Sequence, residues 1–153
     1  MIYAVRLQPQ VADTDMFGYV DYLAFSRWFD RARTTFYQEL FPKFDLKPHG
    51  LAVVKVEVEY CANVAVDDVV EIKTWISRIG AKSFDASQEL VRKTRDGEEV
   101  CAKCRSIFST LNFDRHKSEP LSEHFLAVLR KYADARALDF SNATIERCDS
   151  AEQ

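Results

Sequence analysis

Apolar side chains recur every three to four residues between residues 22 and 40, with charged residues between them. The apolar positions are Phe25, Trp28, Phe29, Ala32, Phe36 and Leu40. This spacing places them on one face of an amphipathic helix. Asp21 is suited to cap the free amides of the first turn, and Pro42 marks the end of the pattern. We therefore predict a helix from Tyr22 to Glu39, about 27 Å long.

After residue 50 the apolar period falls to two, which is typical of strands with one buried face. On one face of the first such segment lie Val54, Val56, Val58 and Tyr60. The pair Asp96-Gly97 is a strong signal for a hairpin turn between the last two segments. The predicted strands are Ile2–Gln8, Leu51–Tyr60, Val69–Ile79, Ala81–Thr94 and Glu98–Phe113. A final helix is predicted up to Tyr132, with Ser122 as its cap.

The predicted order is one strand, a long helix, four strands and a short helix. Strands joined by short turns pair antiparallel, and the long helix cannot leave its apolar face in water. That helix must therefore pack on the apolar face of the sheet. The sequence predicts an α+β fold, in which a long central helix is wrapped by a curved antiparallel sheet of about five strands.

The 153 residues, of which 47% are hydrophobic, suit a single domain that builds its core without disulfides or metal. We predict this domain over residues 1–140 and a polar tail over residues 141–153. Because 24 acidic residues nearly balance 21 basic ones, there is no electrostatic case for nucleic acid. Neither a membrane span nor a signal-peptide pattern is found, so we expect a cytoplasmic protein with free cysteines.

Several catalytic and binding motifs are missing from the sequence. The four glycines are scattered, so no Gly-rich phosphate loop is present, and neither a Gly-x-Ser-x-Gly elbow nor a paired-histidine zinc motif occurs. Cys101 and Cys104 form a Cys-x-x-Cys motif, but it lies inside a predicted strand, where residues three apart point to opposite faces. We therefore expect no metal and no cofactor.

The segment from Asp13 to Tyr22 leads directly into the long helix, and its spacing supports two interpretations. In the first, it is a loop with Asx turns, a bend at Gly18 and a helix cap at Asp21. In the second, the free amides at the helix start stabilise the oxyanion that forms when a carbonyl is attacked. Asp15 beside them then attacks the carbonyl or activates water, which suffices for a thioester because thiolate is a good leaving group.

This segment, Asp-Thr-Asp-x-x-Gly-Tyr-Val-Asp-Tyr, resembles the hot-dog-fold acyl-CoA thioesterases of the 4-hydroxybenzoyl-CoA thioesterase family. The resemblance continues through the helix, residues 56–60 and 67–72, Lys82-Ser83-Phe84 and the last hairpin, roughly residues 1–120 in all. It implies the hot-dog fold and hydrolysis of an acyl-CoA or acyl-carrier-protein thioester to a free acid and a thiol. It also implies a homodimer or homotetramer, paired through an open sheet edge, with active sites between subunits.

The resemblance also assigns roles to single residues. It implies that Asp15 is the catalytic nucleophile or general base, and that the backbone amide of Tyr22 lies in the oxyanion hole. Gly18 keeps the loop close enough for the thioester to pass. Lys82 and Ser83 match positions that contact the nucleotide end of CoA, with a solvated lysine at a strand end as the alternative for Lys82.

The acyl group is left open by the sequence. Tyr19, Tyr22 and Phe25 either line an acyl pocket or serve as core aromatics. Many relatives have Gly-His-Val-Asn-Asn where this chain has Gly-Tyr-Val-Asp-Tyr, and His49 is taken as a surface histidine. Two other functions stay open: a hot-dog hydratase or dehydratase acting on an acyl-CoA, and an acyl-CoA-binding module without catalysis.

Overall fold

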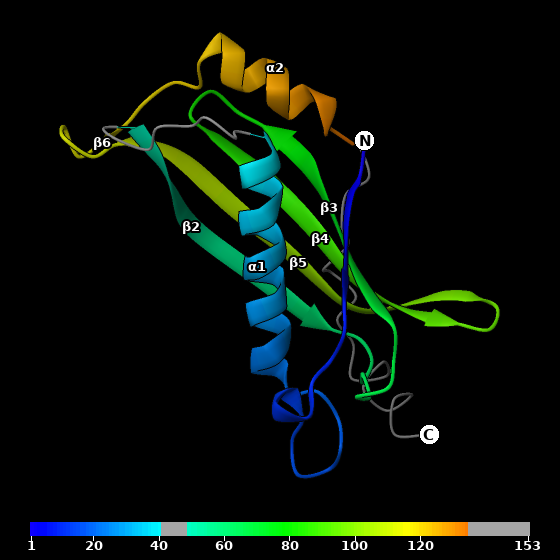
Figure 1. Ribbon diagram of the computed structural model, residues 1–153. Helices are drawn as coiled ribbons and strands as arrows, with labels where there is room; N and C mark the ends of the chain where they lie inside the picture. Colours follow the sequence, from blue (N-terminus) through cyan, green and yellow to red (C-terminus); the bar gives the residue numbers. More distant parts are fainter. Residues whose placement is uncertain (41–48, 135–153) are drawn as a thin grey trace.

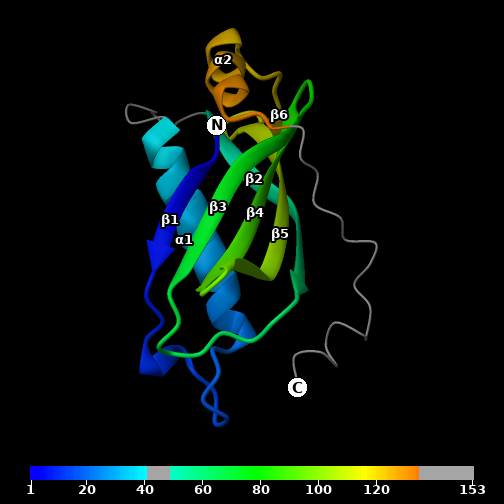
Figure 2. The same ribbon diagram turned by 90° about the vertical axis from the view of Figure 1, so that its right-hand side faces the viewer.

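The computed structural model describes residues 1–40 and 49–134, without the side chain of His49. A long helix lies against one face of a curved sheet, and a short helix crosses one end (Figure 1, Figure 2). In chain order the elements are β1 (Tyr3–Leu7), the 3-10 turn η1 (Val11–Asp13), α1 (Tyr22–Leu40), β2 (His49–Tyr60), β3 (Val70–Ile79), β4 (Ser83–Thr94), β5 (Gly97–Asn112), β6 (Lys117–Ser118) and α2 (Glu123–Lys131). The predicted α+β architecture is confirmed, with a short sixth strand added.

The strands form one antiparallel sheet in the order β1-β3-β4-β5-β2, and β6 pairs with the end of β5. The hairpins β3–β4 and β4–β5 are those predicted from short connections. The strand β2 pairs with β5 rather than with β3, its neighbour in sequence. Consequently β2 is an edge strand, and it lies along one side of α1.

The core lies between α1 and the sheet and divides into two apolar clusters. The site-end core lies under the first half of α1 and includes Phe25, Trp28, Phe29, Val70, Ile72 and Leu90. The α2-end core lies under the second half and includes Phe36, Leu40, Phe84, Phe108, Phe125 and Leu129. All six apolar positions predicted on the long helix are buried, and Arg33 is buried with them.

The apolar face of β2 contains a bulge that the alternating pattern did not predict. The register between β2 and β5 shifts between Val53 and Lys55, so Val53 lies opposite Phe108 and Val56 opposite Ser106. Because the bulge adds one residue, Val53 and Val56 face the same side of the sheet although they are three residues apart. All three valines of this edge, Val53, Val54 and Val56, are half-exposed.

Both predicted helix caps are present. The amide of Ala24 donates to Asp21 Oδ1 at 2.8 Å, and the amide of Phe125 donates to Ser122 Oγ at 3.2 Å. The three cysteines in the described part of the chain are free thiols, whereas Cys148 and the predicted tail lie outside it. None of the helices described is long and apolar enough to cross a membrane.

Candidate active site

A tight loop from Thr14 to Val20 precedes α1 and presents Asp15. Thr14 bridges to Val20, the Asp15 amide donates to the Tyr19 carbonyl at 2.7 Å, and the Gly18 amide donates to the Asp15 carbonyl at 3.2 Å. Gly18 has a φ of +84°, in the left-handed region that closes such three-residue loops. Nothing lies within 4 Å of the place where a Cβ would stand at Gly18. The backbone conformation, and not crowding, therefore requires glycine here.

The Asp15 carboxylate is exposed, and only one of its oxygens is engaged. Oδ1 accepts from the Phe17 amide at 2.8 Å and from the Tyr19 amide at 3.2 Å. Among the residues described, no side chain or amide pairs with Oδ2. The Asx-turn interpretation is confirmed for Asp15, and it is compatible with a chemical role, because the turn uses one oxygen and leaves the other free.

The start of α1 lies beside this loop with open backbone groups. Asp21 caps Ala24, whereas the amides of Tyr22 and Leu23 donate to no acceptor within residues 1–40 and 49–134. Two free N–H groups at the positive end of a helix dipole are suited to hold an oxyanion. The local sequence explains the opening, since the short Asp21 side chain reaches the third amide of the helix but not the first two.

Aromatic rings form the surface next to these amides. The half-exposed Tyr22 ring stacks on Tyr60 with a centroid separation of 4.2 Å. Phe25 is fully buried beneath them, with its ring 6.1 Å from Tyr22 and 6.0 Å from Tyr60. Tyr19 is 43% exposed. Of the aromatic candidates, Tyr19 and Tyr22 are thus accessible, whereas Phe25 supports them from the core.

Asp13 ties the loop to α1, a role that could not be told apart from that of Asp15 by sequence alone. Its carbonyl accepts from the Asp21 amide at 2.9 Å, and its carboxylate lies 3.7 Å from the Arg27 guanidinium. The Val20 amide donates to a carbonyl of the β2–β3 connection at 2.8 Å. The loop is therefore fixed from both sides, which limits the positions that the Asp15 carboxylate can reach.

Lys82 and Ser83 lie far from Asp15 in the same chain. The strand β3 begins opposite Leu7, just before the Asp15 loop, and ends at the turn that holds Lys82. Ten strand residues span about 33 Å, so the two regions lie at opposite ends of the sheet. Lys82 is exposed, whereas Ser83 Oγ accepts from Arg78 Nη2 at 2.9 Å.

A groove of about 560 Å³ lies beside the Lys82 turn. Its apolar lining includes Leu51, Leu111 and Phe125, and its cationic lining consists of Arg115 and Lys117. Neither cation forms an ion pair with any residue that the structure describes. This groove could not be predicted from the sequence, because its walls come from β2, β5, β6 and α2, which only the fold brings together.

The sequence matches the family model of the thioesterase-like superfamily over residues 9–129. The chain belongs to this superfamily. No match was found among curated proteins. The predicted class of enzyme, a thioester hydrolase, is thereby confirmed, and the resemblance found in the sequence led to the right family.

Solved structures show the same fold as this thioesterase-like protein. A predicted thioesterase from Bacillus stearothermophilus has a TM-score of 0.77 at 24% identity, covering 90% of this chain and all of that one. The 4-hydroxybenzoyl-CoA thioesterase from Pseudomonas sp. strain CBS-3 has a TM-score of 0.70 at 18% identity, covering 83% and 98%. A hypothetical protein from Staphylococcus aureus in complex with CoA has a TM-score of 0.79 at 11% identity, covering 94% and 91%. The hot-dog fold is confirmed.

Two buried cysteines of this thioesterase-like protein, Cys101 and Cys104, are poor nucleophiles. Burial raises the pKa of the Cys101 thiol to about 12, and burial also raises the pKa of Cys104. Their thiols are therefore protonated at neutral pH. No group of three potential metal ligands occurs in the described part of the chain.

Proposed function

We propose that the protein hydrolyses an acyl-CoA or acyl-carrier-protein thioester to a free acid and a thiol, within a single domain spanning residues 1–140. One observation carries this proposal: the Asp15 carboxylate has one free oxygen, and the fixed loop that carries it leads directly into two free amides at the start of α1. Structural neighbours that include thioesterases for 4-hydroxybenzoyl-CoA and 1,4-dihydroxy-2-naphthoyl-CoA support a CoA thioester as the substrate class.

In the proposed reaction the thioester carbonyl oxygen accepts from the Tyr22 amide, with the Leu23 amide as a second donor. Asp15 removes a proton from water, and the hydroxide adds to the carbonyl carbon to give an oxyanion held by these amides. Collapse of this intermediate breaks the carbon–sulfur bond, and the thiolate takes the proton back from Asp15. In the alternative, Asp15 attacks the carbon directly, expels the thiolate and forms an anhydride that water then hydrolyses.

We further propose that two chains pair through β2. This strand is an edge of the sheet, and it carries the half-exposed Val53, Val54 and Val56. An open apolar edge strand is a template for pairing with a second chain, and a two-fold axis makes such pairing antiparallel. Sedimentation equilibrium tests this pairing, and a monomer at micromolar concentration would contradict it. A dimer or a dimer of dimers is expected.

Antiparallel pairing of β2 with its copy would complete the site. It places the Tyr60 end of one chain, which carries the Asp15 loop, beside the Gly50 end of the other, which carries the groove. The two regions that lie apart in one chain would then meet across the interface. We propose that the phosphates of CoA bind there, near Lys82, Arg115 and Lys117, and that the pantetheine follows the apolar floor.

The test of the reaction is Asp15→Asn. The new amide oxygen still accepts from the Phe17 and Tyr19 amides, so the loop and the fold are preserved. We expect turnover to fall by about 10³-fold or more in an assay of free thiol release from a panel of acyl-CoA and acyl-carrier-protein thioesters. Asp67→Asn, at an exposed carboxylate in the β2–β3 connection, is the control and keeps full activity. Near-normal turnover by Asp15→Asn would contradict the proposal.

A further inference from the structure

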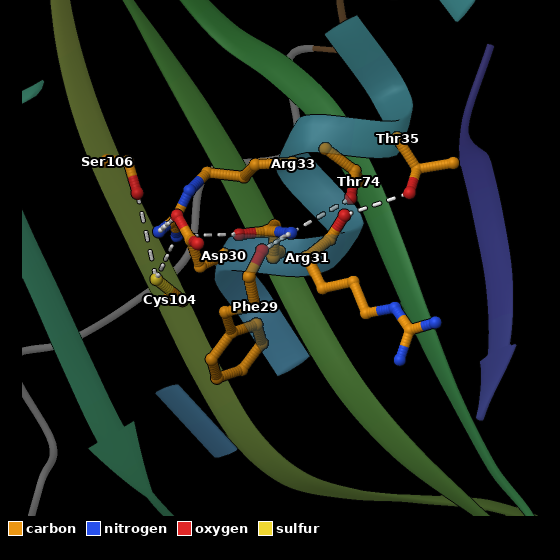
Figure 3. Close-up of polar contacts among 9 residues, drawn as sticks. Phe29, Asp30, Arg31, Arg33, Thr35, Thr74, Cys104 and Ser106 are labelled. Carbon is orange, nitrogen blue, oxygen red and sulfur yellow. Dashed lines mark hydrogen bonds and ion pairs between the residues drawn. The ribbon is translucent and has the colours of Figure 1, made fainter. Parts of the chain in front are cut away.

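A layer of buried polar side chains separates the two cores, and the proposed reaction does not use it (Figure 3). Arg33 reaches from α1 to the sheet and is only 7% exposed. Its Nη1 donates to Gln88 Oε1 at 3.1 Å and lies 3.5 Å from Cys104 Sγ. Gln88 in turn donates to Thr74 Oγ1 at 3.2 Å. The layer is thus built around a guanidinium group in the interior.

The charge of this guanidinium is poorly balanced. Among the residues described, the carboxylate in contact with it is that of Asp30, whose Oδ1 lies 3.4 Å from Nη2 and whose side chain is 74% exposed. Gln88 is neutral, and burial raises the pKa of Cys104, so neither supplies negative charge. Arginine stays protonated in proteins, and a buried charge without a close counter-ion is costly.

Two further groups in the same place have unused hydrogen-bonding capacity. The Tyr37 hydroxyl, one turn after Arg33, is buried and has no hydrogen-bond partner in the described part of the chain. Its ring packs edge-on against Phe108 at 5.2 Å. The fully buried Ser106 hydroxyl has a 3.8 Å contact with Cys104 Sγ. A buried hydroxyl left without a partner is costly, so a bound acceptor would be favourable at this cluster.

The polar layer lies beside β2. Val56 lies directly opposite Ser106 in the sheet, and Val58 lies opposite Cys104. Val56 is 46% exposed, whereas Arg33 and Ser106 are buried. The side of the layer next to Val56 is therefore the side from which a ligand would reach Arg33.

We propose that Arg33, with Tyr37 and Ser106, binds a carboxylate at the far end of the acyl group. The preferred substrates are then ω-carboxyacyl thioesters, an inference that rests on the proposed thioesterase function. A guanidinium group binds a carboxylate through two parallel hydrogen bonds, and the two hydroxyls supply further donors. Along α1 the rise from Tyr22 to Arg33 is about 16 Å, shortened by the backward tilt of the arginine side chain, so an acyl group of medium length fits.

The test compares kcat/KM for pairs of acyl-CoA thioesters of equal length, from four to twelve carbons, ending in carboxylate or methyl. We expect the wild type to prefer the carboxylate by about 10- to 100-fold at its best length, and Arg33→Gln to abolish this preference. Tyr37→Phe should lose a smaller part of it. Arg31→Gln is the control, because Arg31 is exposed and its side chain points away from the layer in Figure 3.

Equal rates for the two members of each pair in the wild type would overturn the inference. An equal loss of kcat/KM on both members of a pair in Arg33→Gln would also overturn it, since this is the result expected if Arg33 has only a structural role. Arg33→Met, an apolar side chain of similar length, replaces Arg33→Gln if the latter does not fold. If no thioester is hydrolysed, the proposed function fails separately. The site is then tested by the rise in melting temperature that free dicarboxylates and monocarboxylates cause. A rise with dicarboxylates that is lost in the Arg33 variant supports the site. Equal rises with the two kinds of acid overturn it.

Discussion

The two ends of α1 pack against the same sheet but finish in different ways. At its start, Tyr22 and Leu23 are exposed and their amides are free. At its other end Leu40 is buried, and α2 closes the core with Phe125 and Leu129. The second half of α1 is covered by apolar side chains of the α2-end core, whereas the start of α1 keeps free backbone donors. The proposed chemistry uses the end of the helix that is left uncovered.

The aromatic rings of the two ends differ in the same sense. Phe84 is fully buried, stacks on Phe108 at 5.4 Å, and contacts Tyr37 and Phe125. Tyr22 also stacks on a neighbouring ring but is 53% exposed. Substitutions in the α2-end core should therefore lower stability, whereas substitutions around the Asp15 loop should lower turnover.

The largest expected effect on stability is that of Phe84→Ala. Loss of a ring packed against three others should lower the free energy of unfolding by about 3–5 kcal/mol. Urea unfolding followed by circular dichroism measures the loss. Turnover per folded molecule at saturating substrate should fall far less than in Asp15→Asn, because the ring touches none of the groups proposed to react. A parallel drop in turnover of folded protein would remove the distinction between the two ends.

Much of this architecture could be predicted because local patterns agree with it. The apolar period of residues 25–40, the caps Asp21 and Ser122, and the turn at Asp96-Gly97 each act over a few residues. The same patterns failed where a distant contact decides. The bulge at Val53 depends on the register with β5, and the burial of Arg33 depends on Gln88, 55 residues away.

For the same reason, only one half of the candidate site could be predicted from the sequence. Asp15, Gly18 and Tyr22 lie within eight residues, and a short loop must keep them together. The groove near Lys82 takes its two cations from beyond the end of β5, and no periodicity relates Arg115 and Lys117 to the aspartate. These cations would come close to Asp15 only through pairing with a second chain, so their proximity stays a prediction.

Gly18→Ala is expected to have an intermediate effect on stability and a larger one on turnover. A side chain at a φ of +84° costs about 1–2 kcal/mol, and relief of this strain moves the Asp15 carboxylate. Gly97→Ala is the matched control, since Gly97 also has a positive φ, +139°, but turns the β4–β5 hairpin. Both variants should lose stability in thermal unfolding. Only Gly18→Ala should lose turnover, by about tenfold or more. Equal turnover in the two variants would mean that the loop tolerates displacement of Asp15.

The smallest effect concerns Glu98, in the hairpin that projects from the sheet (Figure 1). Lys73 and then Lys93, through hydrogen bonds, lower its pKa from 4.5 to about 2. A carboxylate with a depressed pKa in the folded state adds stability above its unfolded value, and this contribution disappears as the pH falls from about 4.5 through about 2. Glu98→Gln should therefore lower the urea midpoint at pH 7, and by much less at pH 2. Because Glu98 and its two lysines are partly exposed to solvent, the loss in free energy of unfolding should stay below about 1 kcal/mol and shrink with added salt. Asp96→Asn, in the same turn, removes a carboxylate that forms no ion pair with the residues described, and is the control for the urea midpoint at pH 7. Turnover at pH 7 should be unchanged in both variants. The proposed reaction requires the Asp15 carboxylate at the start of α1, and neither hairpin carboxylate takes part in it.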